Sequence, residues 1–195
     1  MTSTDKIFSM PSNLILLCGI KHSGKSLCGK ALAAKLGIAF ADSDEVIETL
    51  YRREYHAEKS CREIFREKGE AFFKDLECRA AALIAEQKPI IAAAGGGLCD
   101  NPPAVSVYKA AGAFFVFLDE PQMRLYERIV KSGIPPFLES YDPKAAFSRL
   151  YERRRQLYRE TADATLTAAE NDEPVDRRTQ RLTALLKEFQ NGGTL

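Results

Sequence analysis

Residues 19–26 read Gly-Ile-Lys-His-Ser-Gly-Lys-Ser, and the apolar run Leu-Ile-Leu-Leu-Cys at 14–18 leads directly into them. The octapeptide fits the phosphate-binding pattern G-x-x-x-x-G-K-[ST], in which backbone N–H groups curl around phosphate oxygens at a helix N-terminus. A helical apolar pattern follows it at Leu27, Ala31, Ala34 and Leu36. A strand, a glycine loop and a helix in this order favour a nucleotide site over a plain glycine-rich turn.

Short apolar runs alternate with longer helical patterns along the rest of the chain. This alternation is typical of an α/β fold with a parallel sheet that helices cover on both faces. Helix starts are expected at the capping box of Ser60 and Glu63, and at three acid-proline pairs that place proline at the first helical position. The expected strands are 13–19, 39–42, 89–94, 113–118 and 164–167, and the acid-proline pairs are Glu120-Pro121, Asp142-Pro143 and Glu173-Pro174.

Composition limits the class of protein. The 195 residues suit one domain (1–195), and 28 Lys and Arg against 27 Asp and Glu leave a net charge of +1, so neither nucleic acid nor a membrane is an expected partner. Five scattered cysteines without metal-ligand spacing are typical of a reducing compartment. The N-terminus lacks an apolar signal segment, and no run is long enough to span a membrane. We expect a cytoplasmic protein, and a monomer by default.

The loop at 19–26 predicts where the phosphoryl donor binds. Lys25 is expected against the β- and γ-phosphates of ATP, and Ser26 on Mg²⁺. His22 either contacts phosphate or faces solvent from a loop that works through its backbone. The remaining expected nucleotide contacts within the loop are Gly19, Ser23, Gly24 and Leu27.

Asp42 and Asp44 follow the second expected strand, at the edge where open α/β sheets bind ligands. One of them is expected to support the Mg²⁺ shell and the other to accept a hydrogen bond or proton from a substrate hydroxyl. In the alternative reading, Asp44 only caps the helix expected over 45–50.

A single helix is expected over 61–86, and Glu77 lies along its apolar face, where a carboxylate needs a partner. Lys74 is one candidate. Because Lys74 also follows Glu70 by four residues, a surface ion pair is the stronger reading for it.

The third expected strand ends in Gly95, Gly96 and Gly97. Either these glycines allow a phosphate or polyol to approach the backbone closely, or they form a flexible turn. Arg154 lies in the inward stripe of the helix that begins at Asp142-Pro143, so it needs an anion. That anion is either a ligand or a structural carboxylate such as Glu77 or Asp163. Its neighbours Arg153 and Arg155 read as solvated or phosphate-facing flanks.

Two features lie further along. Arg128 either contacts adenine or phosphate or complements a helix C-terminus. Residues 132–142, with Gly133, Pro135 and Pro136, have the length and chemistry of a mobile lid beside a nucleotide site, and otherwise of a surface loop.

The loop at 19–26, Asp42-x-Asp44, the stretch 60–77, the glycines 95–97 and Arg154-x-x-Leu157-Tyr158 together resemble shikimate kinase, in order from about residue 13 to 167. The resemblance implies a nucleoside-monophosphate-kinase-like, three-layer P-loop kinase fold with a five-stranded parallel sheet and a lid. It also implies transfer of the γ-phosphoryl group of ATP to a ring hydroxyl of shikimate.

By position, the resemblance implies that Asp42 supports Mg²⁺ and that Arg128 contacts adenine. It also implies an acceptor-binding segment over 44–77, in which Asp44 binds the acceptor hydroxyls and Glu77 orients the cations of the acceptor site. The three glycines would line the acceptor, and Arg154 would bind the carboxylate of the acceptor. The chain departs from the family at Lys74 and Pro135, where the family has arginines. These departures leave two alternatives open: a kinase for another small acceptor, and a nucleotide-binding module without transfer activity.

Overall fold

The computed structural model describes residues 10–132, 141–169 and 172–190. Within them, five strands form one parallel sheet in the order β2-β3-β1-β4-β5. The strands are β1 (Leu14–Cys18), β2 (Ala39–Asp42), β3 (Ile90–Ala93), β4 (Phe114–Asp119) and β5 (Ala164–Thr167). Each strand expected from the sequence is therefore present, within one residue or so at its ends.

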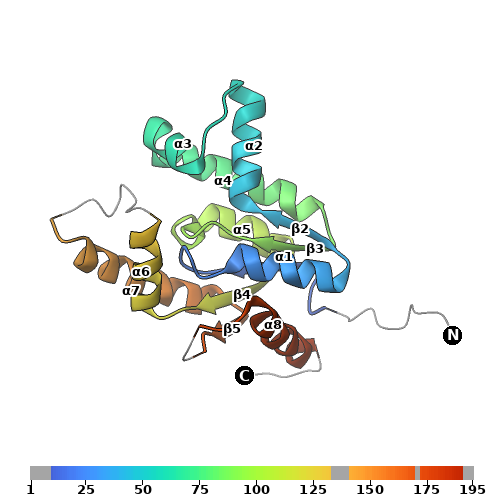
Figure 1. The fold of residues 1–195 in the computed structure, drawn as a ribbon. Helices are drawn as coiled ribbons and strands as arrows, with labels where there is room; N and C mark the ends of the chain where they lie inside the picture. The colour runs from blue at the N-terminus through green and yellow to red at the C-terminus, as the bar shows by residue number, and fades with distance from the viewer. Residues whose placement is uncertain (1–9, 133–140, 170–171, 191–195) are drawn as a thin grey trace.

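Helices cover both faces of this sheet (Figure 1). One face packs on α1 (Lys25–Leu36) and α8 (Val175–Gln190), around Leu17, Leu32, Leu182 and Leu186. The other packs on α4 (Glu70–Glu86), α5 (Pro102–Ala110), α6 (Gln122–Lys131) and α7 (Pro143–Thr161), with a short 3-10 helix η1 (Leu98–Asp100) before α5. The predicted α/β class with three layers is confirmed.

A smaller cluster lies beyond the sheet edge at β2. It joins α2 (Ser43–Tyr55) and α3 (Cys61–Lys68) to α4 through Ile47, Tyr51, Ile64, Leu76 and Ala80. Figure 1 shows α2 and α3 standing away from the sheet at this end. The cluster fixes the segment 44–77 beside the carboxyl ends of β2 and β3.

The single helix expected over 61–86 is wrong. The chain breaks at Gly69, whose φ of 84° and ψ of 174° belong to a region that is essentially restricted to glycine. The apolar spacing continues through the break, because α3 and α4 both pack on the same cluster. Periodicity alone therefore hides the change of direction.

Helix starts are confirmed in part. Ser60 and Glu63 form the predicted capping box, and Asp142 caps α7 by accepting a hydrogen bond from the Ala145 N–H. Glu120 does not cap α6, because Pro121 itself occupies the cap position and Glu120 is buried in ion pairs. Before α8, Glu173 pairs with Arg181 at 2.6 Å.

Among the described residues, no helix is both long and apolar enough to cross a membrane. The five cysteines are all free thiols. The expected lid falls almost wholly on residues 133–140, which lie outside the described part of the chain, as do Pro135 and Pro136.

Candidate active site

The phosphate-binding loop leaves β1 at the centre of the sheet and enters α1. Two of its glycines have positive φ, 142° at Gly19 and 86° at Gly24. A Cβ on Gly19 would lie 2.9 Å from the backbone oxygen of Leu118, so the loop also packs directly on β4. Ser23, a residue of the same loop, is fully buried. Glycine is needed at Gly24 for its backbone conformation. At Gly19 it is needed both for backbone conformation and for the space beside Leu118.

Lys25 is the first residue of α1, and its side chain folds back into the loop. Its ammonium donates hydrogen bonds to the carbonyl oxygens of Gly19 (2.9 Å) and Ile20 (3.1 Å). Burial lowers the pKa of Lys25 to about 8, although Asp44 and Asp42 favour the charged form. The ammonium also donates to the Ser23 hydroxyl at 3.4 Å, so its hydrogen-bond partners among the described residues are all neutral. A buried cation held in this way is suited to receive an anion.

Ser26 and Asp42 meet beside the loop. The Ser26 hydroxyl donates to Oδ2 of Asp42 at 2.5 Å, and Oδ1 of Asp42 accepts the N–H of Asp44 at 3.0 Å. Asp42 is thus the N-cap of α2. The alternative in which Asp44 caps this helix is wrong, because the helix begins at Ser43 and its cap is one residue earlier.

Asp44 faces the open cleft from the first turn of α2. Its side chain is solvent-accessible, yet protein atoms surround it at the bottom of the cleft. This loss of hydration, with Asp42 as the next cause, raises the pKa of the Asp44 carboxyl, while Lys25 and Lys21 oppose the shift.

The glycine turn after β3 approaches these groups closely. A Cβ on Gly95 would lie 2.9 Å from Oδ1 of Asp44 and 3.6 Å from Oε1 of Glu77, and one on Gly96 would lie 2.7 Å from the backbone nitrogen of Lys21. The N–H of Gly95 donates to the buried Ser43 hydroxyl at 2.8 Å. The turn is therefore held against the phosphate-binding loop and leaves the carboxylates accessible.

Glu77 has the partner that its position requires, but that partner is not Lys74. The buried Asn101 amide donates to Oε2 of Glu77 at 3.0 Å and to the Lys74 carbonyl at 2.9 Å. Burial raises the pKa of Glu77 despite this hydrogen bond. Lys74 instead pairs with Glu70 at 2.7 Å, as the i,i+4 spacing predicts.

Arg154 points inward from α7 as predicted, and a carboxylate that the sequence reading missed holds it. Oδ2 of Asp100 accepts from Nε at 2.9 Å and from Nη2 at 2.8 Å, while Nη1 donates to the Gly96 carbonyl at 3.1 Å. Neither Glu77 nor Asp163 is paired with it in these contacts, and Asp163 accepts the Phe115 N–H. Arg154 therefore connects α7 to the glycine turn.

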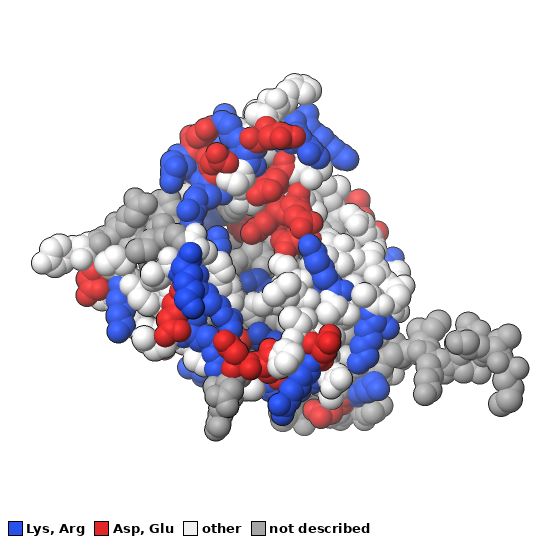
Figure 2. Space-filling view, in the orientation of Figure 1, with Lys and Arg blue, Asp and Glu red and all other residues white. Residues whose placement is uncertain are grey.

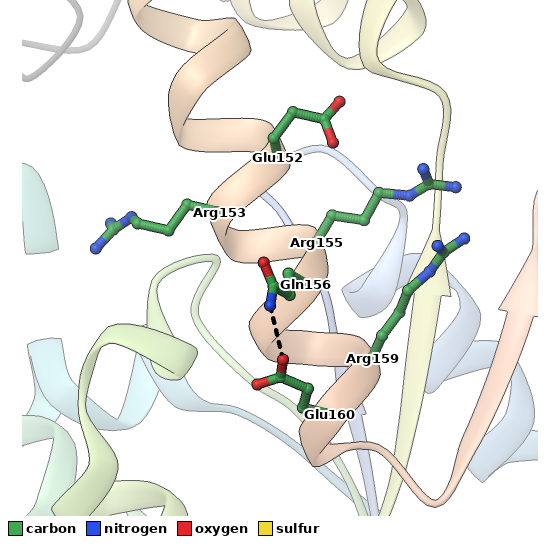
Figure 3. A pocket seen from close by; sticks show the side chains of 6 residues that line it. All are labelled: Glu152, Arg153, Arg155, Gln156, Arg159 and Glu160. Atoms are coloured by element: carbon green, nitrogen blue, oxygen red, sulfur yellow. Dashed lines mark hydrogen bonds between the residues drawn. The ribbon is translucent and has the colours of Figure 1, made fainter.

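The outer face of α7 carries a separate hollow of about 390 Å³ (Figure 3). Arg155 and Arg159 point from it toward β4, where both bind the buried Asp119 at 2.9 to 3.1 Å. Arg153 points to the opposite side and pairs with Asp100 at 3.0 Å. Neither Arg153 nor Arg155 lines the cavity beside the phosphate-binding loop. Arg155 ties α7 to β4 through Asp119, and Arg153 is a largely exposed partner of Asp100.

Arg128 spans the far side of the loop. Its guanidinium donates to the His22 carbonyl and to Asp172, each at 2.9 Å. The His22 ring lies 2.9 Å from the Ser132 hydroxyl, and burial, followed by Lys21, Lys25 and Arg128, lowers the pKa of His22. Arg128 thus contacts the loop itself, which a plain dipole-complementing role at the end of α6 does not require.

One cavity of about 570 Å³ unites most of these groups. Figure 2 shows the hollow at the centre of the molecule, with acidic side chains gathered over the start of α2 and basic ones over α6 and α7 on the opposite side. Lining residues include Lys21, His22, Gly24, Lys25, Ser26, Leu27, Cys28, Asp42, Asp44, Gly95, Gly96, Arg128, Glu173, Val175 and Arg178.

Sequence reasoning missed Asp100, Glu173 as a cavity residue, and Arg178. Arg178 shares the inward stripe of α8 with Leu182 and Leu186, the same signal that identified Arg154. It is buried and pairs with Glu120 at 2.6 Å. The signal for Asp100 is weaker, because an acid three residues after a glycine turn is common on surfaces.

A central strand that ends in a glycine loop, a lysine within that loop, and a cleft between acidic and basic walls define a P-loop phosphotransferase of the small-molecule kinase type. The family model described as shikimate kinase matches residues 21–187. The chain belongs to the shikimate kinase family.

Relatives and solved structures agree with this family. The chain is 33% identical over 178 residues to the shikimate kinase of Microcystis aeruginosa, covering 90% of this chain and 89% of the relative. It is 34% identical over 168 residues to that of Ruegeria pomeroyi, covering 84% and 81%. The solved shikimate kinase of Acinetobacter baumannii in complex with shikimate superposes with a TM-score of 0.78 at 27% identity, over 93% of this chain and 96% of that one.

Proposed function

We propose that this protein transfers the γ-phosphoryl group of ATP to a ring hydroxyl of shikimate. The observation that carries the proposal is the meeting of donor and acceptor chemistry in one place. Lys25, Asp44, Gly95 and Gly96 line the same cavity, and Arg154 is bonded to Gly96. Family membership supports the choice of shikimate among small carboxylated polyols.

The donor half consists of the loop at 19–26 and α1. Its backbone N–H groups hold phosphate oxygens, and Lys25 leaves its carbonyl partners to offset negative charge on the β- and γ-phosphates. Ser23 lies in the loop, and Leu27 lies in the first turn of α1. Arg128 and His22 shape the side of the site that is remote from the acceptor.

Mg²⁺ fits the donors of Ser26 and Asp42, since both offer hard oxygen atoms that already lie together. When bound, this ion would neutralise phosphate charge during transfer. Ser26 would hold the ion directly, and Asp42 would accept hydrogen bonds from its water molecules.

The acceptor half consists of Asp44, Glu77, the glycine turn and Arg154. The raised pKa of Asp44 suits a carboxylate that accepts the proton of a substrate hydroxyl. Arg154 binds the acceptor carboxylate, Glu77 orients the cations near it, and Lys74 contributes positive charge at the rim. Gly95, Gly96 and Gly97 let the ring approach the backbone.

ADP release with and without shikimate tests the proposal. Arg154→Met is expected to raise the KM for shikimate at least tenfold while nucleotide affinity is retained, and Arg149→Met, an exposed arginine of the same helix, is the matched control. Asp44→Asn is expected to lower kcat by about 10²-fold or more, the usual scale of a lost general base. Glu45→Gln on the next residue is its control. No stimulation of ADP release by shikimate would reject shikimate as the acceptor.

One observation favours a second candidate, a kinase for a different small acceptor. Lys74 and Arg154 already carry carboxylate partners of the chain, Glu70 and Asp100, so the acceptor site is less positive than its cations alone indicate. A panel of hydroxy acids and polyols, scored for phosphorylated product, separates this candidate from shikimate. Nucleotide binding without turnover of any acceptor would instead indicate a nucleotide-binding module.

The proposal includes one catalytic domain over residues 1–195, a lid near 132–142, a monomeric state and a cytoplasmic location. Five free thiols and a net charge near neutrality are compatible with that location. Light scattering on the purified protein measures the oligomeric state. Fractionation of the source cells measures the location.

A further inference from the structure

The phosphate-binding loop carries a second lysine, Lys21, in addition to Lys25. Lys21 lies between the two positive-φ glycines of the loop, Gly19 and Gly24. Its side chain is exposed and lines the cavity in which the donor and acceptor groups meet. Any role for Lys21 in this cavity rests on the proposed transfer reaction.

Lys21 differs from the other basic side chains of the cavity in its contacts. Across the described ranges 10–132, 141–169 and 172–190, its ammonium makes neither an ion pair nor a hydrogen bond. Arg128 and Arg178 bind carboxylates of the chain, and Lys25 donates to carbonyl oxygens of the loop. Lys21 can therefore bind a ligand without giving up a contact to any of these described residues.

The glycine turn after β3 fixes where the Lys21 side chain begins. A Cβ on Gly96 would lie 2.7 Å from the backbone nitrogen of Lys21 and 3.1 Å from its Cβ. Each glycine of the turn has a different charged neighbour, in the order Asp44 beside Gly95, Lys21 beside Gly96 and Arg154 beside Gly97. Lys21 thus belongs to the donor loop but lies against the acceptor turn, next to the residues that flank the acceptor.

Lys21 also acts on the charge of the acceptor carboxylate. Burial raises the pKa of Asp44, and Lys25 and Lys21 both oppose that rise. Lys25 does so from a buried position in the loop, whereas Lys21 is exposed. An exposed lysine is a compact charge on a flexible four-carbon stem, so its ammonium can move with a ligand. Of these two cations, one is fixed in the donor loop and the other is movable.

The transfer step requires a cation that can move. The acceptor hydroxyl oxygen forms a bond to the γ-phosphorus, the bond from that phosphorus to the β,γ-bridging oxygen breaks, and its electron pair stays on ADP. The hydroxyl proton passes to Asp44. The oxygens of the transferred group therefore shift toward Asp44 and Asp42, where like charges repel them. A cation that follows the group offsets this repulsion.

We propose that the Lys21 ammonium binds a non-bridging oxygen of the phosphoryl group during transfer and still holds that group on the phosphorylated acceptor. Lys21 then distinguishes the phosphorylated acceptor from the unphosphorylated one, while Arg154 binds the carboxylate that both forms share. In this role Lys21 is a catalytic residue, because it touches the reacting group. It takes no part in bond formation or proton transfer.

Binding measurements without turnover test this role. The probes are shikimate, its phosphate monoester shikimate 3-phosphate, and ADP, each titrated alone. Lys21→Met removes the charge and keeps an unbranched side chain beside Gly96. It is expected to weaken the binding of shikimate 3-phosphate at least about tenfold, the scale of one hydrogen bond to a charged group, and to leave shikimate and ADP nearly unchanged.

The rate of the chemical step provides a second measurement. In single turnovers, Lys21→Met should transfer the phosphoryl group at least about tenfold more slowly, with the KM for shikimate unchanged, because the contact forms as the group is transferred. Lys21→Arg retains a cation and should recover most of both losses. Lys35→Met removes an exposed lysine at the other end of α1 and is the matched control, expected to change neither measurement.

The outcomes separate this role from others. Unchanged affinity of Lys21→Met for shikimate 3-phosphate would remove the phosphoryl contact. An equal loss for shikimate would assign the ammonium to the carboxylate or hydroxyls of the acceptor, and an equal loss for ADP would assign it to the nucleotide. If shikimate does not stimulate ADP release by the wild-type protein, the inference falls together with the proposed function. Stimulation that Lys21→Met retains in full rejects the inference alone.

Discussion

One carboxylate oxygen of Asp100 binds two nitrogens of the Arg154 guanidinium, Nε at 2.9 Å and Nη2 at 2.8 Å. Both side chains are largely buried, at 17% and 14% exposure. Asp100 therefore sets the angle at which Arg154 crosses the glycine turn. It also lowers the net positive charge that an acceptor carboxylate meets there.

Asp100→Ala is expected to loosen Arg154 and to destabilise the fold by about 1–3 kcal/mol, the usual loss when a partly buried charged group loses its partner. The KM for the acceptor should rise while the KM for ATP stays constant. Steady-state kinetics and urea unfolding measure the two effects. Arg153→Ala is the control, since its exposed guanidinium (58%) contacts the same carboxylate. A KM for ATP that rises in parallel would contradict a role confined to the acceptor.

Gly95→Ala is expected to lower acceptor turnover by about tenfold or more, because a 1 Å displacement of a reacting group has effects of this size. The new Cβ would lie 2.9 Å from Oδ1 of Asp44 and must displace it. Gly97→Ala is the graded comparison, because its Cβ would meet the flexible end of Arg154 at 3.2 Å. Affinity for ADP should be unchanged in both. Wild-type turnover in Gly95→Ala would mean that Asp44 does not require this space.

Nucleotide affinity is expected to fall as pH rises through about 8. Burial lowers the pKa of Lys25 to about 8, and the charged form is the one that binds phosphate, so raising the pH removes the binding form of the free protein. Between about pH 7 and about pH 9 the affinity for ADP should drop roughly tenfold, with proton uptake on binding. Calorimetry in two buffers of different ionisation enthalpy measures both. In Lys25→Met the residual affinity should show no such step, and a flat wild-type profile would contradict the prediction.

Gly69→Ala is expected to destabilise the protein by about 1–3 kcal/mol through backbone strain, because no atom lies within 4 Å of its added Cβ. The cause is the φ of 84° with ψ of 174° between α3 and α4. Urea denaturation measures the loss. Gly29→Ala is expected to destabilise the protein for a different reason, because its new Cβ would lie 2.5 Å from the Phe40 ring. The unfolding free energies of the two variants therefore compare backbone strain with steric overlap. A neutral Gly69→Ala would show that α3 adopts another angle at little cost.

The strands and the loop at 19–26 were predictable because their signals are local. An apolar run that ends in Gly-x-x-x-x-Gly-Lys-Ser leaves few alternatives, and all five strands occur where hydrophobic runs meet turn residues. The break at Gly69 was not predictable from spacing, since the apolar positions of α3 and α4 face one cluster from both sides of the turn. A glycine in a helical pattern is a weak signal by itself.

Inward cations were predictable, but their partners were not. The spacing of α7 identified Arg154 as needing an anion, yet Asp100 lies 54 residues away in sequence and meets it only in the folded chain. The role of Asp42 as the cap of α2 depends on a two-residue difference in helix start, a boundary that sequence patterns define poorly. Arg178 and Glu120 are paired across β4 and α8, a contact that no local pattern indicates.

The strand order β2-β3-β1-β4-β5 places β1 in the middle, so the chain fills one side of the molecule before it begins the other. Residues 39–100 supply Asp42, Asp44, Glu77 and the glycine turn, and residues 119–178 supply Arg128, Glu173 and Arg178. Arg154 of α7 reaches back to the glycine turn, as its neighbours Arg153 and Tyr158 also do through Asp100 and the Gly95 carbonyl. Apart from Arg154, the acceptor half is consequently one uninterrupted stretch of chain, which recombination between related sequences can exchange in a single pair of crossovers. The contact between Arg154 and Asp100 must then be preserved between the exchanged stretch and the rest of the chain.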